Sequence, residues 1–215
     1  MTARWCAWAL CTVMTLAGPV AGCSQTVTGT AMRTAPAIDE ESRSPVDVDA
    51  VLLDRPQLQA ITGAGDDLTA IPGMQSKTPV DVDFMLESVP QQCQWVFAET
   101  QVFGPELEEF IKSSYQSPRR GGVISQAAAG YRDEATARAA FERLLERIRG
   151  CEQSRAGRQL VGAVSAAPDS VATRPGDCGR DYRVKAAVLV EVTFCAFPST
   201  VPDIVLTNIM ANVPG

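Results

Sequence analysis

Seven cysteines and their positions restrict what this chain can fold into more than any other feature of the sequence. Cys6 and Cys11 lie in an apolar N-terminal stretch, and Cys23 follows directly after that stretch. The other four are Cys93, Cys151, Cys178 and Cys195. An even number of cysteines in an exported protein indicates disulfide bonds, and four cysteines allow three pairings. With Cys23 used for anchoring, the rest of the chain is expected to fold around two disulfides.

The first 22 residues have the composition of a bacterial export signal. Arg4 is followed by an apolar run, residues 5–21, which carries no further charge. The run is short for a membrane-spanning helix, which needs about 20 apolar residues, and Pro19 lies near its end. It leads into Val20-Ala-Gly-Cys23, which resembles the lipobox of bacterial lipoproteins, whose cysteine thiol is alkylated by diacylglycerol before cleavage. The alternatives are an ordinary signal peptide that has a cysteine at this place, or an uncleaved anchor.

We therefore divide the chain into a signal peptide at residues 1–22, a lipidated Cys23 with a disordered tether to residue 46, and one domain at residues 47–215. The tether holds mainly small and polar residues and has no apolar periodicity, so it cannot bury enough apolar surface to offset its ordering entropy. The domain is long enough to form its own core. The expected location is the extracytoplasmic face of the cell membrane, which the protein contacts through the lipid anchor.

The composition excludes several classes of function. The formal net charge is −6 and the basic residues are not clustered, so nucleic acid is not an expected partner. The chain contains no histidine, which excludes histidine-dependent catalytic triads and zinc sites built on histidine. Once the four cysteines are paired, no thiolate remains as a nucleophile. We expect no catalytic residue, no metal site and no cofactor.

Capping residues and apolar periodicity predict four helices. Their approximate ranges are 55–62, 105–113, 134–149 and 202–212. Asp133 caps the third, in which apolar residues recur at helical spacing: Ala137, Phe141, Leu144, Leu145 and Ile148. The second begins at Pro105 and is predicted because the three glutamates that follow suit the positive end of a helix.

Six strand-like runs lie between these helices. Their ranges are 80–87, 94–99, 121–129, 159–166, 181–185 and 188–194. Several consecutive runs are joined by connections too short for a parallel crossover. The expected fold class is therefore α+β, with a mainly antiparallel sheet packed against about four helices.

The last two strands indicate how the cysteines pair. In an antiparallel hairpin the numbers of opposed residues have a constant sum. Cys178 and Cys195 have the same sum as Lys185 and Val188, so one register opposes both pairs across a two-residue turn at residues 186–187. A disulfide between opposed strand positions is feasible, and it leaves the other two cysteines to each other. Two alanines make a poor two-residue turn, because such turns prefer positive φ, so a slightly longer loop is expected.

Several segments, taken in order, carry a family resemblance. They are Leu52-Leu53 with Leu58 and Gly63; Pro90 before Cys93; Gly130-Tyr131 with Ala137, Ala140 and Phe141 before Cys151; Cys178 with the run Val188–Cys195; and Asn212-Val213-Pro214. This order resembles the extracellular sensor domain of the mycobacterial Ser/Thr kinase PknH and the stand-alone lipoproteins that share it. The resemblance covers essentially residues 47–215, and it rests on the cysteine spacing together with its flanking patterns.

The resemblance implies an α+β domain with two disulfides and a cleft for an unidentified ligand. The implied pairs are Cys93–Cys151 and Cys178–Cys195, in agreement with the hairpin register. The sequence contains no kinase domain: it has no Gly-rich loop, no Asp-Phe-Gly and no histidine for a catalytic loop. Only the sensing part of such a kinase is expected here.

Five residues are candidates for the wall of a ligand cleft. Trp95, Tyr131 and Tyr182 are aromatic residues that either line a cleft or pack in the core, Trp95 beside a disulfide. Arg119 and Arg120 stand next to two glycines, as in a site for an anion or a phospholipid headgroup, or they lie in a solvated loop.

Acidic residues suggest two further sites that the sequence supports poorly. Asp47 with Asp49, and Asp81 with Asp83, have the spacing of calcium ligands on a strand, but a calcium site needs six or more oxygens. Two of the three glutamates after Pro105 are an alternative acid pair for glycoside hydrolysis. Such a pair needs its carboxyl groups about 5–10 Å apart across a cleft, which residues at the start of one helix do not provide.

The function expected from these features is that of a non-enzymatic, monomeric envelope lipoprotein whose cleft binds a small molecule, lipid, glycan or protein. One alternative is a secreted hydrolase that uses carboxylates alone, which requires two acids pointing into one pocket. Another is a scaffold that contacts an envelope protein through an apolar surface patch.

The lipid anchor is tested by Cys23→Ala. Two acyl chains on Cys23 hold a protein on a membrane because each buried CH₂ contributes about 0.8 kcal/mol. The variant is expected to move from the membrane fraction to the soluble fraction, as followed by immunoblotting of fractionated cells. Cys11→Ala is the control and leaves the distribution unchanged. A Cys23→Ala protein that loses its signal peptide and stays on the membrane contradicts the prediction.

Overall fold

The computed structural model describes residues 44–215. The expected signal peptide, the lipid anchor at Cys23 and most of the expected tether lie outside these residues. Within residues 44–215, no helix combines the length and the apolar character that crossing a membrane requires.

One antiparallel sheet of seven strands runs through the described domain in the order β1-β2-β3-β7-β6-β5-β4. The strands are β1 (Thr69–Ala70), β2 (Leu107–Ser117), β3 (Gly122–Tyr131), β4 (Ala163–Ala167), β5 (Ser170–Arg174), β6 (Cys178–Lys185) and β7 (Val188–Cys195). Sheet and helices together confirm the predicted α+β class with a mainly antiparallel sheet.

Within residues 44–215, six α-helices accompany the sheet. They are α1 (Arg55–Thr62), α2 (Asp83–Leu86), α3 (Glu99–Phe103), α4 (Glu134–Glu152), α5 (Arg155–Val161) and α6 (Thr200–Asn212), with 3-10 helices at Val48–Ala50, Gly65–Asp67 and Gln91–Val96. Asp54 and Gln57 form a capping box on α1, and the predicted cap Asp133 accepts the Thr136 amide of α4. Gly63 ends α1 in the left-handed conformation, with φ 62°.

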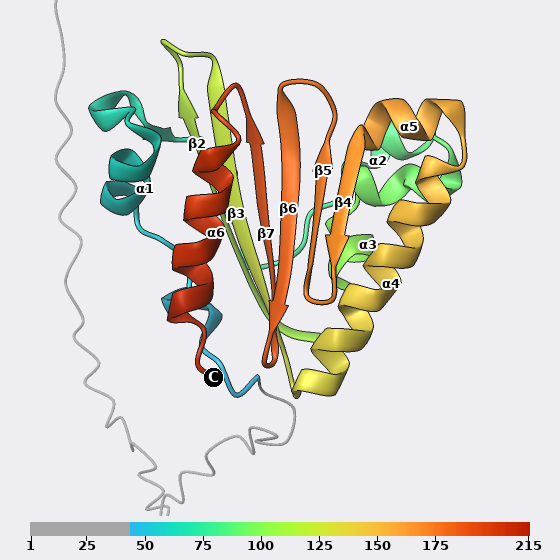
Figure 1. Ribbon diagram of the computed structural model, residues 1–215. Helices are drawn as coiled ribbons and strands as arrows, with labels where there is room; N and C mark the ends of the chain where they lie inside the picture. Colours follow the sequence, from blue (N-terminus) through green and yellow to red (C-terminus); the bar gives the residue numbers. More distant parts are fainter. Residues whose placement is uncertain (1–43) are drawn as a thin grey trace, which may run out of the picture. The chain divides into compact units, whose positions relative to one another are not determined.

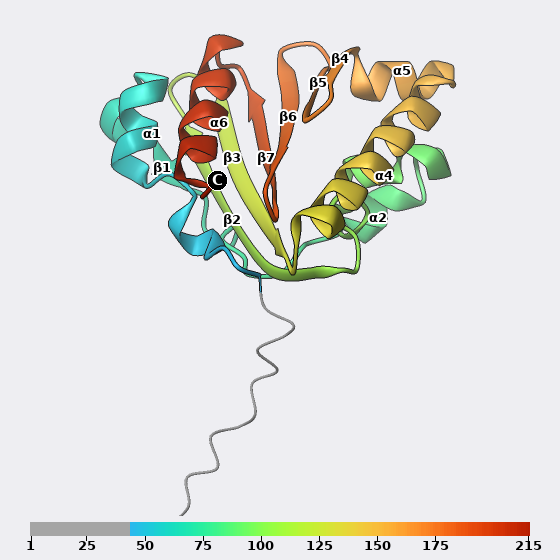
Figure 2. The same ribbon diagram turned by 60° about the horizontal axis from the view of Figure 1, so that its bottom comes forward.

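The helices cover both faces of the sheet (Figures 1 and 2). On one face, α4 and the 3-10 helix Gln91–Val96 pack over a core that includes Phe141, Leu144 and Ile148 of α4. On the other face, α1 and α6 enclose a second core. The strands supply both cores because successive side chains point to opposite faces, as at Ala127 and Ala128 of β3.

The described chain begins against the end of β3. Gly130 has no side chain, and a Cβ built there would lie 2.6 Å from the Ser44 Oγ and 3.0 Å from the Val48 Cγ1. The Ser44 hydroxyl donates to the Val46 carbonyl at 3.1 Å, and Val46 is buried. The absence of a side chain at Gly130 therefore lets the first described residues pack onto the C-terminal end of β3.

The predicted helix at residues 105–113 is wrong, since this segment begins the eleven-residue strand β2. β2 pairs with β3 along almost its whole length, with an irregularity between Leu107 and Glu109. Pairing with β3 from Leu107 onward, together with the isolated bridge between Ser76 and Lys112, stabilises the extended conformation more than acidic side chains favour a helix start. β5 was not predicted as a separate strand, and the run at 159–166 proves to be the end of α5 followed by β4.

The predicted strands at residues 80–87 and 94–99 are also wrong. The first contains the short helix α2, and the second begins in the 3-10 helix Gln91–Val96 and ends at the first residue of α3. The two segments pair with each other at one isolated bridge, between Asp81 and Ala98. A short apolar run does not distinguish a strand from a buried helical turn, because it is too short for either hydrophobic periodicity to be recognised.

Both predicted disulfides are present. Cys178 and Cys195 are opposed in the β6–β7 hairpin and are bonded, in the same register as Lys185 and Val188. The expected longer loop is wrong: the turn consists of two residues, and Ala186 adopts the required positive φ of 47°. The second disulfide, Cys93–Cys151, joins the 3-10 helix Gln91–Val96 to α4.

The two disulfides are expected to contribute unequally to stability. The Cys93–Cys151 bond spans 58 residues and the Cys178–Cys195 bond spans 17. Replacing both members of a pair by serine should lower the free energy of unfolding by about 4 kcal/mol for the longer loop and about 3 kcal/mol for the shorter, because the unfolded chain regains loop entropy. Urea denaturation of the two double variants measures this order, and a larger loss for the shorter loop would contradict it.

Candidate functional site

An apolar groove of about 260 Å³ lies on the α4 side of the sheet, which we call the Trp95 groove. Its walls are formed mainly by apolar side chains, among them Met74, Val80, Val82, Trp95, Phe97 and Val123. Val123 and Ser125 lie on the same face of β3 as the core residues Ala127 and Ala129, since side chains alternate along a strand. The groove is therefore the continuation of the core face toward the N-terminal end of β3.

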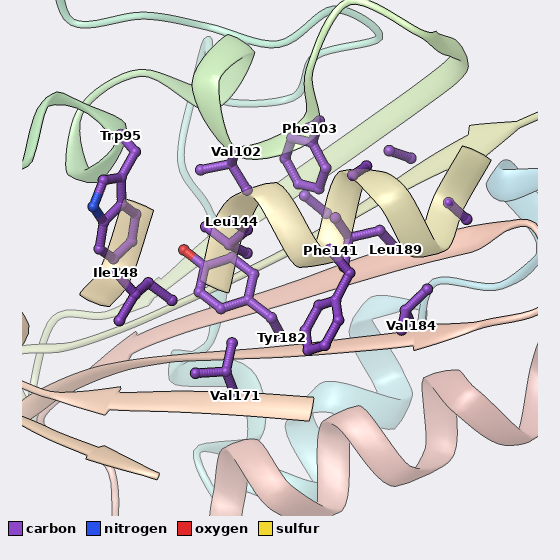
Figure 3. Close-up of a cluster of buried hydrophobic side chains, with 14 of the residues drawn as sticks. Trp95, Val102, Phe103, Phe141, Leu144, Ile148, Val171, Tyr182, Val184 and Leu189 are labelled. Carbon is purple, nitrogen blue, oxygen red and sulfur yellow. The ribbon is translucent and has the colours of Figure 1, made fainter. Parts of the chain in front are cut away.

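Trp95 lies between the groove and the core. It is 1% exposed and makes an edge-to-face contact with Tyr182, at a centroid separation of 6.5 Å and an interplanar angle of 67°. Figure 3 shows the Tyr182 hydroxyl on the side of its ring that faces Trp95. The guanidinium of Arg180 lies 6.0 Å from the centroid of the Trp95 ring system, within the range of a cation–π contact.

Two buried polar atoms have no hydrogen-bond partner in the described structure: Nε1 of Trp95, which lines the groove, and the hydroxyl of Tyr182, which contacts Trp95 from the core. Burial raises the pKa of Tyr182 well above its ordinary value, the charge of Glu191 raises it further, and Arg180 opposes the shift. The hydroxyl is therefore protonated at neutral pH. A buried donor without an acceptor costs about 1–3 kcal/mol, so both groups gain from an acceptor placed next to them.

Glu99 fixes one wall of the groove. Its carboxylate forms an ion pair with Lys112 of β2 and accepts the Val80 amide at 2.8 Å. The two side chains of the pair are only 14% and 19% exposed. Asp81 strengthens the same connection, because it accepts the Thr100 amide at 3.1 Å and the Thr100 hydroxyl at 2.7 Å. These contacts tie the segment before α2 to α3 and the sheet.

The remaining charges of the groove belong to Arg180 and Glu191. Both side chains line the groove and are half-buried. Glu191 accepts the Thr193 hydroxyl at 2.5 Å. Within residues 44–215, neither Arg180 nor Glu191 belongs to a salt bridge.

The structure brings together only two of the five predicted cleft residues, Trp95 and Tyr182. Tyr131 is fully buried in the α4-side core, where its hydroxyl donates to the Phe103 carbonyl at 2.7 Å and burial raises its pKa. Because this hydroxyl already has its partner and the ring has no exposed surface, Tyr131 acts in packing and not as a groove wall.

Arg119 and Arg120 lie in the β2–β3 turn and contact the segment that follows α1. Arg119 pairs with Asp67, with its Nε 3.2 Å from Oδ1, while Arg120 donates to the Gly63 carbonyl at 3.0 Å. Such a contact suits a cation at a helix C-terminus, where carbonyl groups lack partners. The two arginines are separate from the Trp95 groove, whose lining does not include them.

The acidic pairs considered as calcium ligands have other partners. Asp47 accepts the Asp49 amide at 3.0 Å, and the Asp49 carboxylate pairs with Lys77. Asp81 binds Thr100, as described above. No cluster of three or more candidate metal ligands occurs in the part of the chain that the structure describes.

The sequence argument did not identify Arg180 and Glu191, although the hairpin register contains the signal. The same register that opposes the two cysteines opposes Arg180 with Thr193 and Tyr182 with Glu191. Arg180 and Tyr182 are two residues apart on β6, and Glu191 and Thr193 are two residues apart on β7. All four side chains therefore lie on one face of the sheet. Extending the register from the disulfide would have placed both charges beside the candidate tyrosine.

Comparison with known proteins identifies a family and solved structures of similar fold. A family model described as a PknH-like extracellular domain matches residues 44–212. The crystal structure of the extracellular domain of PknH from Mycobacterium tuberculosis matches with a TM-score of 0.53 and 13% identity, over 79% of this chain and 97% of that chain. No curated protein matches the sequence. The family and the two disulfides indicate an extracytoplasmic location.

The Glu99–Lys112 pair is testable as a support of the groove. Glu99→Gln should lower the free energy of unfolding by about 2 kcal/mol, because it leaves the largely buried Lys112 ammonium without its counter-charge. Glu108→Gln is the matched control on β2, since Glu108 is exposed, and it should change stability by less than about 0.5 kcal/mol. Urea denaturation compares the two variants, and equal effects would show that the pair does not support the wall.

Proposed function

Because the chain belongs to the PknH-like extracellular domain family, we propose that it is a non-enzymatic binding or sensing protein of the cell envelope that recognises a ligand in the Trp95 groove. A diacylglyceryl anchor on Cys23 presents it at the extracytoplasmic face of the cell membrane. It acts as a monomer and needs no cofactor or metal. Its ligand is an envelope component: a small molecule, lipid, glycan or protein segment.

The observation that carries the proposal is the pair of buried donors without acceptors, at the edge of an apolar groove. Trp95 Nε1 and the Tyr182 hydroxyl belong to residues with 1% and 0% exposure, so solvent reaches neither side chain easily. Ligand sites combine apolar walls with a few convergent polar groups. The Trp95 groove has that combination, with Arg180 and Glu191 as further polar groups.

A carboxylate hydrolase is the second candidate, because Glu99 and Glu191 line the same groove. Their partners argue against it. Glu99 is ion-paired with Lys112 and accepts the Val80 amide, and Glu191 accepts the Thr193 hydroxyl, so both carboxylates are engaged within the protein. Binding requires neither group to exchange a proton.

The binding function is tested by what co-purifies with the protein. Native protein isolated from its own membranes is analysed by mass spectrometry for bound lipids and glycans, in parallel with Val82→Lys and Ile204→Lys. Val82 lines the groove, so its replacement by lysine is expected to abolish co-purification. Ile204 is 47% exposed on α6, on the opposite face of the sheet, and its replacement should leave co-purification unchanged. Equal recovery from both variants would place the site elsewhere.

Two further measurements separate binding from hydrolysis. Addition of the recovered compound should raise the melting temperature of wild-type protein, because a ligand selective for the native state stabilises it by mass action. Ester, peptide, phosphate and glycoside substrates should show no turnover. Turnover that disappears in both Glu99→Gln and Glu191→Gln would replace the binding proposal by the hydrolase.

A further inference from the structure

We propose that the ligand of the Trp95 groove is an amphipathic molecule whose head group carries an anionic oxygen, a carboxylate or a phosphate. This inference rests on the proposed function and adds the chemical class of the ligand. It follows from the kind of polar groups in the groove, from the partners of its charges and from the position of its exposed apolar side chains.

The unsatisfied polar groups are hydrogen-bond donors. The indole N–H of Trp95 donates and cannot accept, and the Tyr182 hydroxyl is held in its protonated form by burial. Arg180, whose guanidinium lies over the Trp95 ring, adds further N–H donors at the same place. An anionic oxygen is the acceptor that such donors bind most strongly, because charge-assisted hydrogen bonds are stronger than neutral ones.

The charges in the groove leave Arg180 as the available cation. Lys112 is engaged by Glu99. Glu191 makes the groove formally neutral, and its carboxylate is engaged by the Thr193 hydroxyl. Selection for an anion therefore comes from the position of the donors and not from net charge. A cationic head group would meet Glu191, but it would leave the Trp95 and Tyr182 donors unsatisfied.

The apolar part of the ligand is indicated by the mouth of the groove. Met74 and Val80 line it and are 43% and 48% exposed, so the groove presents apolar surface to solvent there. Val82 and Phe97 continue the apolar wall inward. A hydrocarbon chain that leaves the donors and runs along this wall would cover both exposed side chains. The groove has its hydrogen-bond donors at the inner end and apolar side chains at its mouth. This arrangement matches an amphipathic molecule that inserts with its head group first.

Four probes with the same ten-carbon chain test the inference by isothermal titration calorimetry on the full-length protein. They are decanoate, decyl phosphate, decanol and decyltrimethylammonium, each used below its micelle concentration. We expect the two anions to bind at least tenfold more tightly than decanol, since a charge-assisted hydrogen bond corresponds to about one to two powers of ten in affinity. The ratio of decanoate to decyl phosphate affinity distinguishes a fatty-acid ligand from a phosphate-bearing lipid.

Two variants locate the head group. Arg180→Gln should weaken anion binding about tenfold or more and change decanol binding less than about threefold. Arg183→Gln is the control on the same strand, because Arg183 is paired with Asp203 of α6 on the opposite face, and it should leave every affinity unchanged. Trp95→Phe keeps an aromatic ring without the N–H, and it should weaken anion binding about threefold or more.

The outcomes separate the ligand class from the function. Equal binding of decanol and decanoate, with equal losses in Arg180→Gln, would overturn the anionic head group while leaving the groove as the binding site. Preferential binding of decyltrimethylammonium would overturn it in favour of a ligand that pairs with Glu191. Absence of binding by all four probes would overturn the amphipathic class, and the co-purification comparison of Val82→Lys with Ile204→Lys would then decide on the groove itself.

Discussion

The disulfide between Cys93 and Cys151 is the constraint on which the groove side of the molecule depends. Residues 71–106, between β1 and β2, form no strand of the sheet and contain only short helical segments and isolated bridges. Such a segment has few backbone contacts of its own to fix its position. The disulfide ties it to α4, which is held on the sheet by its apolar stripe. Trp95, two residues after Cys93, is thereby held against Tyr182.

The parts of the fold that were predictable are those whose signals are local or repeat many times. Eight opposed pairs define the β6–β7 hairpin, so one register accounts for the whole ladder and for the Cys178–Cys195 bond. The helix α4 spans 19 residues, enough for its apolar stripe to recur over several turns. Both elements keep the conformation that their own residues favour.

The parts that were missed depend on partners distant in sequence. Glu106, just before β2, and the two glutamates near the start of β2 favour a helix locally, but pairing with β3 decides the conformation. Residues 95–98 form an apolar run that suits a strand, yet the disulfide at Cys93 and the packing of Trp95 are satisfied by a 3-10 helix. For the site, aromatic character identified Trp95 and Tyr182, whereas finding Arg180 required the β6–β7 register or its contact with the indole ring.

The packing of Ser44 against Gly130 shows at which end of β3 the described part of the chain begins. Gly130 lies at the C-terminal end of β3, while the groove residues Val123 and Ser125 lie near its other end. Gly130 comes five positions after Ser125, which is about 17 Å along a strand. Ser44 therefore lies at the end of β3 remote from the groove. With the anchor that we propose at Cys23, the Trp95 groove is at the far end of the domain from the residue at which its described part begins.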